Sequence, residues 1–202
     1  MEGLTVGRRS SKESILDAAE RVIMRQGMAN TTIEGVAAEA GISKGGLFYH
    51  FTSKKDMLMQ LMDRYERNFT AMRRDIYEAL PESPTRFLKA TVLACVHDPA
   101  RKEHGNISSV LSLLDDVDMR QRVFEMKLRI FEEVARESQS PEKAMLALFA
   151  TDGLWLTELF GKEVISRELL DKVIAQLLHL IDAEGVSVEP SPPMESTVKP
   201  EA

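Results

Sequence analysis

The sequence is poor in several residue types, and each shortage excludes a class of protein. It contains one cysteine, Cys95, which rules out an intrachain disulfide and the clustered thiolates of a zinc finger. Glycine and proline are scarce, with 11 and 8 residues, and alternation of apolar and polar residues is nearly absent. No apolar run approaches the roughly 20 residues that cross a bilayer. These shortages favour an all-α fold without a membrane span.

The 202 residues are rich in hydrophobic side chains. Hydrophobic residues make up 44% of the chain, enough to bury a core in one domain or in two small ones. Near the N-terminus, Arg8 and Arg9 stand where a secretory signal would need an apolar stretch. The sequence therefore predicts a cytoplasmic protein.

Charge is distributed unevenly along the chain. Residues 7–74 contain twelve Lys and Arg against eight Asp and Glu, whereas residues 75–202 contain 14 against 23. A mildly basic N-terminal part joined to an acidic remainder predicts that only the N-terminal part approaches a polyanion such as DNA.

Apolar spacing and capping residues predict four helices in the first 80 residues. Each helix begins at a serine or threonine that can accept a backbone hydrogen bond, and the first two end at a glycine. The capping residues are Ser10, Thr31, Ser43 and Ser53, and the glycines are Gly27 and Gly41. The third helix is short and the fourth is long, extending to about residue 80.

The helical period continues in the remainder of the chain. It predicts five further helices, at residues 85–97, 106–115, 118–138, 141–160 and 166–183. Residues 184–202 combine prolines, serines and charges without an apolar period, which predicts a disordered tail. The expected organisation is a three-helix head over residues 10–52, a helical body over residues 53–183, and this tail.

The second and third helices form a unit that can present a helix to DNA. Gly41 lets the backbone reverse between them without a steric penalty. The third helix then opens with Lys44, Gly45 and Gly46. Two glycines cost about 1 kcal/mol each relative to alanine in a helix, so the fold alone would not select them. They suit a first turn that presses its backbone against base edges in the major groove, with Lys44 near guanine acceptors or a phosphate.

Polar residues around this unit are placed to hold the DNA backbone. Helix N-termini favour anions, and Thr31, Thr32, Thr52 and Lys54 lie at two of them. On the third helix, Leu47, Phe48 and Phe51 are expected to pack inward. An arm containing Arg8 and Arg9 is expected to reach a minor groove or the DNA backbone.

The run TTIEGVAAEAGISKGGLFYHFTSKKDML, together with the helix before it, resembles the DNA-binding head of the TetR family of bacterial transcriptional repressors over about residues 12–61. The resemblance implies a helix-turn-helix in a three-helix head, followed by an all-α body that dimerises. By position in the motif, it implies base contacts from Ser43, Lys44, Gly45, Gly46 and Tyr49. It implies phosphate contacts from Thr32, His50 and Lys54. Thr31 and Thr52 are also predicted to contact phosphates, because they lie at helix N-termini. Many members have tyrosine where this chain has Phe48, so a hydroxyl contact to phosphate is expected to be missing there.

The body carries less specific signals. Family bodies usually enclose an effector cavity, and its candidate lining is Met62, Tyr65, Phe69, Phe87, Phe124, Phe131, Phe149, Asp152 and Trp155. Core packing is the alternative for each of them, and Asp152 could instead pair across a dimer or join a local polar network. The last two helices have broad apolar faces, which predict a four-helix dimer interface. Its candidate residues are Leu156, Leu170, Val173, Ile174, Leu177 and Ile181.

These patterns predict a homodimeric, sequence-specific repressor that a small-molecule effector releases from a near-palindromic double-stranded operator. The alternatives are an architectural DNA-binding protein without an effector, and an all-α binding protein or enzyme whose head merely packs. No catalytic set and no cofactor-binding motif is recognisable. His97, Asp98, Glu103 and His104 are expected to be solvated residues of a loop rather than metal ligands. No catalytic residue, cofactor or metal is therefore predicted.

Overall fold

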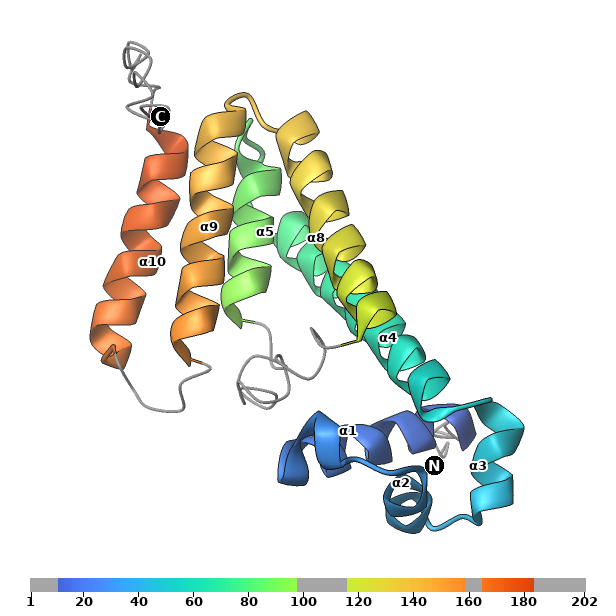
Figure 1. The fold of residues 1–202 in the computed structure, drawn as a ribbon. Coiled ribbons are helices and arrows are strands. Elements are labelled where there is room, and N and C mark those ends of the chain that lie inside the picture. Colours follow the sequence, from blue (N-terminus) through green and yellow to red (C-terminus); the bar gives the residue numbers. More distant parts are fainter. Residues whose placement is uncertain (1–10, 98–115, 159–164, 184–202) are drawn as a thin grey trace, which may run out of the picture.

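Figure 1 shows the computed structural model, which describes residues 11–97, 116–158 and 165–183. Over these ranges the protein consists of helices without strands, which confirms the all-α class. The helices are α1 (Ser11–Asn30), α2 (Ile33–Ala40), α3 (Lys44–His50), α4 (Lys54–Ala79), α5 (Arg86–His97), α8 (Val117–Glu137), α9 (Pro141–Glu158) and α10 (Arg167–Asp182). The arm with Arg8 and Arg9, the helix predicted at 106–115 and the tail at 184–202 lie outside the described residues.

Capping side chains explain where the short helices begin. The hydroxyl oxygens of Thr32, Ser43 and Ser53 each accept a hydrogen bond from the backbone N–H three residues later, at 3.0 Å. Thr32 therefore caps α2, and the prediction of Thr31 as its cap is wrong. The Thr31 hydroxyl is buried and donates to the carbonyl of Gly27 at 2.9 Å. Gly27 interrupts α1 with a φ of 80°, close to the predicted end of that helix.

The helices build two hydrophobic cores. The head core combines α1, α2 and α3 with the start of α4, and it includes Met57, Leu58 and Leu61. The body core combines α5, α8, α9 and α10 around Leu88, Val92 and other apolar residues. The first turns of α4 thus contribute to the head core, and the predicted boundary at residue 52 stays a prediction. Helix α4 leads from one core to the other (Figure 1).

The N-terminal end of α8 contacts the head directly. Met119 is 3% exposed and belongs to the head core, although it lies far along the chain. Lys55 at the start of α4 pairs with Asp116, at 3.2 Å, and with Asp118. Farther along the two helices, Arg122 lies 2.6 Å from a carboxylate oxygen of Asp63 and of Glu66. The head is thus attached to the body through α4 and α8 together.

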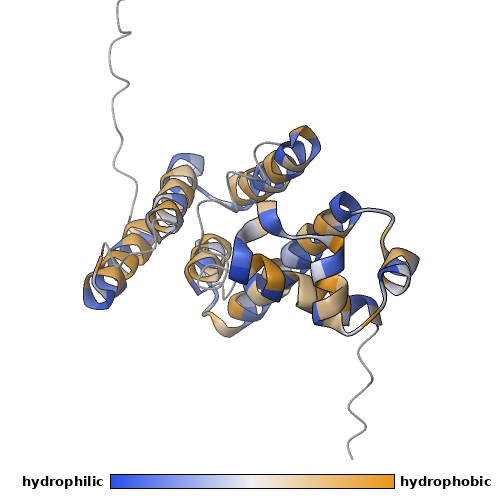
Figure 2. Ribbon diagram, turned by 60° about the horizontal axis from the view of Figure 1, so that its bottom comes forward, coloured by the Kyte–Doolittle hydropathy of each residue, from blue (hydrophilic) through white to orange (hydrophobic). Residues whose placement is uncertain are grey.

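Helix α9 carries apolar side chains on its buried face and on its exposed face. Ala144, Ala147 and Leu148 are buried in the body core, whereas Leu146 and Phe149 are 67% and 58% exposed. The hydropathy colouring in Figure 2 shows apolar stretches along the body helices. No helix in the described ranges combines the length and the hydropathy that a membrane span requires.

Candidate DNA-binding site

A left-handed glycine joins α2 to α3. Gly41 has φ 68° and ψ 31°, and its N–H donates to the carbonyl of Ala38 at 3.1 Å. The next N–H, that of Ile42, donates to the carbonyl of Ala37 at 3.0 Å. A side chain with a Cβ is strained at this φ, so glycine is required for the turn. The predicted helix-turn-helix geometry is confirmed.

Helix α3 buries one face and leaves the other open. Leu47 and Phe51 are 0% and 1% exposed and belong to the head core. Phe48 is 43% exposed, so the prediction that it packs inward is wrong. It lies one helical turn after Lys44, on the flank of α3 rather than on its core face, and its ring centroid is 5.8 Å from Nζ of Lys44.

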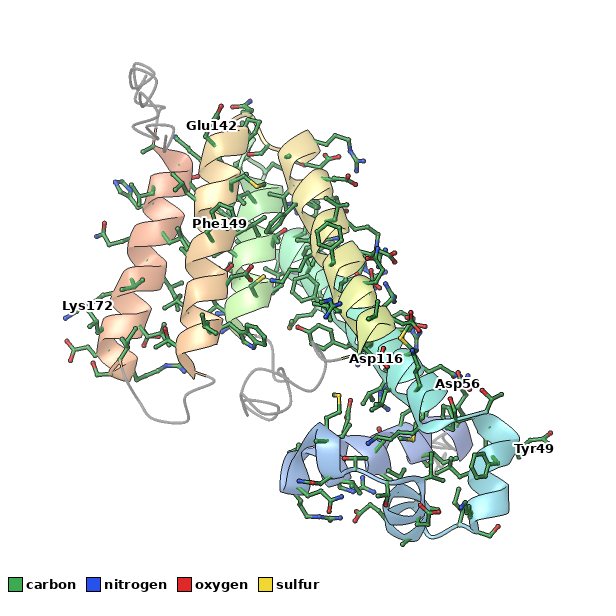
Figure 3. The ribbon with its side chains drawn as sticks, in the orientation of Figure 1. Tyr49, Asp56, Asp116, Glu142, Phe149 and Lys172 are labelled. Carbon is green, nitrogen blue, oxygen red and sulfur yellow. The ribbon has the colours of Figure 1, made fainter. Side chains whose placement is uncertain are left out.

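The open face carries the residues predicted to contact bases. Tyr49 is 86% exposed, and Figure 3 shows its side chain pointing away from the head. Ser43, Lys44 and Gly45 are also exposed, while Gly46 is half-buried. A Cβ added at Gly45 would meet Ser43 Oγ at 3.9 Å, an ordinary contact. Packing in the described structure therefore gives no reason for glycine at position 45.

An ion pair holds Lys44 on the flank of this face. Its Nζ lies 2.5 Å from Oε1 of Glu34 on α2, with the two side chains 57% and 63% exposed. The hydrogen bond from Lys44, the backbone N–H of Glu34 itself and the lysine charge all lower the pKa of Glu34. Sequence reasoning missed this pair because its members lie ten residues apart, across a turn whose geometry sets their distance.

Some of the residues predicted to contact phosphates are exposed, and others are buried or hydrogen-bonded within the protein. Thr32 and Thr52 are exposed, and His50 is half-buried with its ring 5.1 Å from that of Tyr49. The Thr52 hydroxyl and N–H both donate to Asp56, at 3.1 and 2.7 Å. Thr31 is 1% exposed, so the prediction that it contacts phosphate is wrong.

Lys54 is tied to the end of α1. Its half-buried ammonium donates to the carbonyls of Met28 and Ala29, at 3.1 and 3.4 Å, and burial lowers the pKa of Lys54. These carbonyls follow the break at Gly27, and that of Met28 also accepts a hydrogen bond from the N–H of Thr31 at 3.2 Å. Lys54 therefore fixes the α1–α4 junction, and its phosphate contact stays a prediction.

Arg64 of α4 forms ion pairs with carboxylates of α1. It is 7% exposed, and its guanidinium lies 2.7 Å from carboxylate oxygens of Asp17 and Glu20 and 3.3 Å from one of Glu13. Sequence reasoning missed this cluster. The available signal was spacing, because an arginine seven residues after Met57 falls on the buried face of α4.

Comparison with known families agrees with this geometry. The profile described as bacterial regulatory proteins of the tetR family matches residues 15–61. A second profile, described as a tetracyclin repressor-like C-terminal domain, matches residues 85–182. The chain belongs to the TetR family of transcriptional regulators.

Relatives within the TetR family are distant in sequence and similar in fold. The HTH-type transcriptional regulator AcrR of Shigella flexneri is 23% identical over 97 residues, which cover 48% of this chain and 45% of AcrR. The chain spans about half the length of such curated relatives. A TetR-family regulator from Streptomyces coelicolor aligns with a TM-score of 0.69 at 16% identity, covering 85% of this chain and 94% of that one. The regulator FadR from Bacillus subtilis, solved with stearoyl-CoA, aligns with a TM-score of 0.65 at 18% identity, covering 84% and 96%.

The residues predicted to line an effector cavity in this TetR-family body are spread over several environments. Phe69 is buried, while Phe87 and Phe131 are half-buried in the body core. Phe124 and Phe149 are 59% and 58% exposed. The remaining candidates are Met62, half-buried against the head core, Tyr65, 36% exposed, and Asp152 and Trp155, both half-buried on α9.

Asp152 has a structural partner, Lys127 of α8, with which it forms an ion pair. This finding agrees with the local polar network considered for Asp152. An open hollow on the polar surface of α4 and α8 contains none of the predicted aromatic residues. It is lined by Asp63, Glu66, Arg67, Thr70, Ala71, Arg74 and Arg122.

Arg73 is a buried cation in the TetR-family body that the sequence reasoning missed. It is 7% exposed, and its guanidinium lies 4.8 Å from the ring centroid of Phe87 and 6.0 Å from that of Phe69. Its Nη2 donates to Glu133 at 2.8 Å, while the buried Nη1 has no hydrogen-bond partner among the described residues. A buried donor without an acceptor is costly, which makes this junction of α4, α5 and α8 a candidate for ligand binding.

The predicted dimer residues need a correction. Ile174, Leu177 and Ile181 are 9%, 9% and 4% exposed because they face the chain's own helices, so the prediction that they form a subunit interface is wrong. Leu156 and Val173 are 50% and 37% exposed, and Leu170 is half-buried. Other apolar side chains on the same two helices are also exposed. They are Leu146, Phe149, Leu169 and Leu180.

His97, one of the four residues considered for a metal site, is exposed at the end of α5. Asp98, Glu103 and His104 lie outside the described residues.

Proposed function

We propose that this TetR-family regulator is a homodimeric repressor that binds a near-palindromic operator and leaves it when a small molecule binds the body. The observation that carries the DNA-binding part is the open face of α3. Tyr49 is almost fully exposed there, and the first turn of the helix contains Gly45, a glycine that packing in the described structure does not require. A side chain at position 45 would separate the backbone from a base edge, so contact with DNA explains why glycine is placed there.

The exposed apolar surface of α9 and α10 supports dimerisation. Leu146, Phe149 and Leu156 fall on one face of α9, at spacings of three and seven residues. Gly153 lies on the same face, and no described residue comes within 4 Å of a Cβ built on it, which lets another helix approach closely. Leu169, Val173 and Leu180 extend the apolar surface on α10. Pairing these two helices with their copies would bury the surface in a four-helix interface and place two heads on successive major grooves.

Arg73 supports binding of a small molecule in the body. An effector with a carboxylate, carbonyl or hydroxyl oxygen could accept a hydrogen bond from Nη1 of Arg73, which donates none within the part of the chain that the structure describes. The rings of Phe69 and Phe87 would contact an apolar part of the same molecule. Phe124 and Phe149 fit this role less well, since both are more than half exposed.

The contacts between α8 and the head give effector binding a route to the DNA-binding unit. Met119 is part of the head core, and Lys55 pairs with two carboxylates at the start of α8. A ligand that shifts α8 relative to α4 would therefore move the head. Repression ends if the ligand binds better to the conformation whose head spacing does not match the operator.

The decisive experiment is selection of bound sequences from a random duplex pool at physiological salt, with protein stoichiometry measured on the enriched DNA. We expect a near-palindromic sequence bound by two protomers. Retention that depends on salt without enrichment of any sequence would overturn the proposal, because it would leave only nonspecific electrostatic binding.

Two groups of variants separate base contacts from backbone contacts. Lys44→Ala and Tyr49→Ala should weaken binding to the enriched sequence much more than binding to random DNA, whereas Lys54→Ala should weaken both. A mobility-shift assay in which none of the three variants changes DNA retention would contradict the assigned interface.

A further inference from the structure

We propose that Glu34 is a specificity-determining residue, which acts by competing with DNA for Lys44 and thereby weakens binding to the wrong sequence. The inference rests on the proposed function. In addition to the proposed function, a residue of α2, outside the recognition helix, suppresses nonspecific binding.

The geometry sets Glu34 apart from the other acid of α2. Glu39 is only 20% exposed and pairs with Arg21 and Arg25 of α1, at 2.7 Å each, so it holds α2 against α1. Glu34 instead pairs with a residue of α3. It lies 2.5 Å from the ammonium of Lys44, the first residue of α3, and it is 63% exposed.

Both members of the pair would lie close to the DNA surface. Lys44 begins the helix whose open face carries Gly45 and Tyr49, and Glu34 is in direct contact with it. The hydrogen bond from Lys44 lowers the pKa of Glu34, so the carboxylate is ionised at neutral pH. Any approach that brings Lys44 to the duplex therefore brings a negative charge with it.

This charge has different consequences on random DNA and on the operator. A duplex presents one negative charge per roughly 1.7 Å of axis, so on a random sequence the carboxylate is repelled and Lys44 must leave it to reach a phosphate. On a matching sequence the pair presents an ammonium donor beside a carboxylate acceptor. Guanine offers acceptors to the ammonium of Lys44, and the amino group of cytosine or adenine can donate to the carboxylate of Glu34. Glu34 thus penalises random sequences more than a sequence with these groups side by side.

The test compares the full-length wild type with Glu34→Gln on two duplexes of equal length, the enriched operator and a random sequence, over a series of salt concentrations. Glutamine keeps the shape of the side chain and removes its charge. We expect affinity for the random duplex to rise roughly three- to tenfold, and operator affinity to rise by less than about twofold or to fall. The dependence of log affinity on log salt for the random duplex should steepen by about 0.9, as one more phosphate is neutralised by the released Lys44.

Two comparisons isolate the role of Lys44. In a Lys44→Ala background, Glu34→Gln should leave the salt dependence unchanged, because no lysine is released. Glu137→Gln removes the same charge from a 47% exposed side chain at the last residue of α8. Figure 1 shows that this end of α8 lies far from the head. This control should leave both affinities unchanged. Thermal melting of Glu34→Gln should stay within about 2 °C of the wild type, since an exposed ion pair contributes little stability.

The outcomes distinguish this inference from the proposed function. If the wild type discriminates between the duplexes and Glu34→Gln changes both affinities by the same factor, or changes neither, the role of Glu34 is disproved and the proposed function stands. If the wild type does not discriminate, the proposed function fails, and this inference fails with it. A lower specificity ratio with a steeper salt dependence, both requiring Lys44, would support the role of Glu34.

Discussion

The head and the body of this protein use the same kind of helix in different ways. In the head, the apolar side chains of short helices are mostly buried, and the exposed face of α3 carries polar residues and glycine. In the body, α9 and α10 bury one apolar face and expose another. A head of this kind completes its own core and offers a polar surface to a polyanion. A body of this kind leaves apolar surface that is stabilised by contact with another chain.

The largest expected effect tests whether the head depends on a buried charge as well as on its apolar core. Arg64→Ala should lower the free energy of unfolding by about 2–3 kcal/mol, because it leaves three carboxylates of α1 without their shared cation while they keep partial access to water. Urea denaturation measures this change. Arg67→Ala, an exposed position on the same helix, should stay within about 0.5 kcal/mol of the wild type. Equal effects of the two variants would contradict the structural role of Arg64.

The next prediction tests the exposed apolar face of the body. Leu146→Glu should weaken dimerisation by roughly 10- to 100-fold, because a charge would be transferred into an apolar interface, while the helix content of each protomer stays the same. Analytical ultracentrifugation over a range of protein concentrations measures the dimer dissociation constant. His179→Glu, at an exposed position on α10, is the matched control. A dimer unaffected by Leu146→Glu would place the interface elsewhere.

A comparable change in the head should affect DNA binding and leave folding intact. Tyr49→Ala should reduce operator affinity about 10- to 100-fold, the range expected for loss of a specific base contact. Its stability should change by no more than about 0.5 kcal/mol, because the ring is 86% exposed. Fluorescence anisotropy with labelled operator and thermal melting give the two values. Tyr77→Ala, near the far end of α4, should leave operator affinity unchanged. Loss of stability in Tyr49→Ala would mean that this face is part of the fold.

The smallest effects compare one glycine in each region. Gly45 in α3 and Gly153 in α9 both lie inside helices, and no described neighbour of either would block a Cβ. Alanine at either position should stabilise the protomer by about 0.5–1 kcal/mol. Gly45→Ala should weaken operator binding without affecting the dimer, and Gly153→Ala should weaken the dimer. Urea denaturation, fluorescence anisotropy and analytical ultracentrifugation on both variants measure stability, operator affinity and dimerisation. If both variants gain stability and neither operator binding nor dimerisation weakens, the prediction is wrong.

Much of the head could be predicted because its signals are local. Ser43 and Ser53 cap helices through a bond to the residue three positions later, and Gly41 permits a turn that lies within two residues of it. Such interactions depend on the order of residues alone. Even here, two adjacent threonines could each have capped α2, and only the structure shows that Thr32 does so while Thr31 is buried.

The exposure of side chains in the body could not be obtained from the sequence in the same way. The pattern of α10 shows that Ile174, Val173 and Leu177 are apolar, but a broad apolar face does not say which part meets the protomer's own core. Asp152 was an unusual acid in an apolar helix, and its partner Lys127 lies on another helix. The positions of α8 and α9 decide both questions.

By itself, the sequence determined the helical class, the helix-turn-helix and the family, because helical period, caps and glycine turns act over a few residues. Tertiary structure alone decided that Glu34 meets Lys44, that Arg64 gathers three carboxylates, and that Met119 of α8 completes the core of the head. The physical reason is distance along the chain. These partners lie from ten to more than fifty residues apart, and they meet only because packed apolar faces fix where each helix lies.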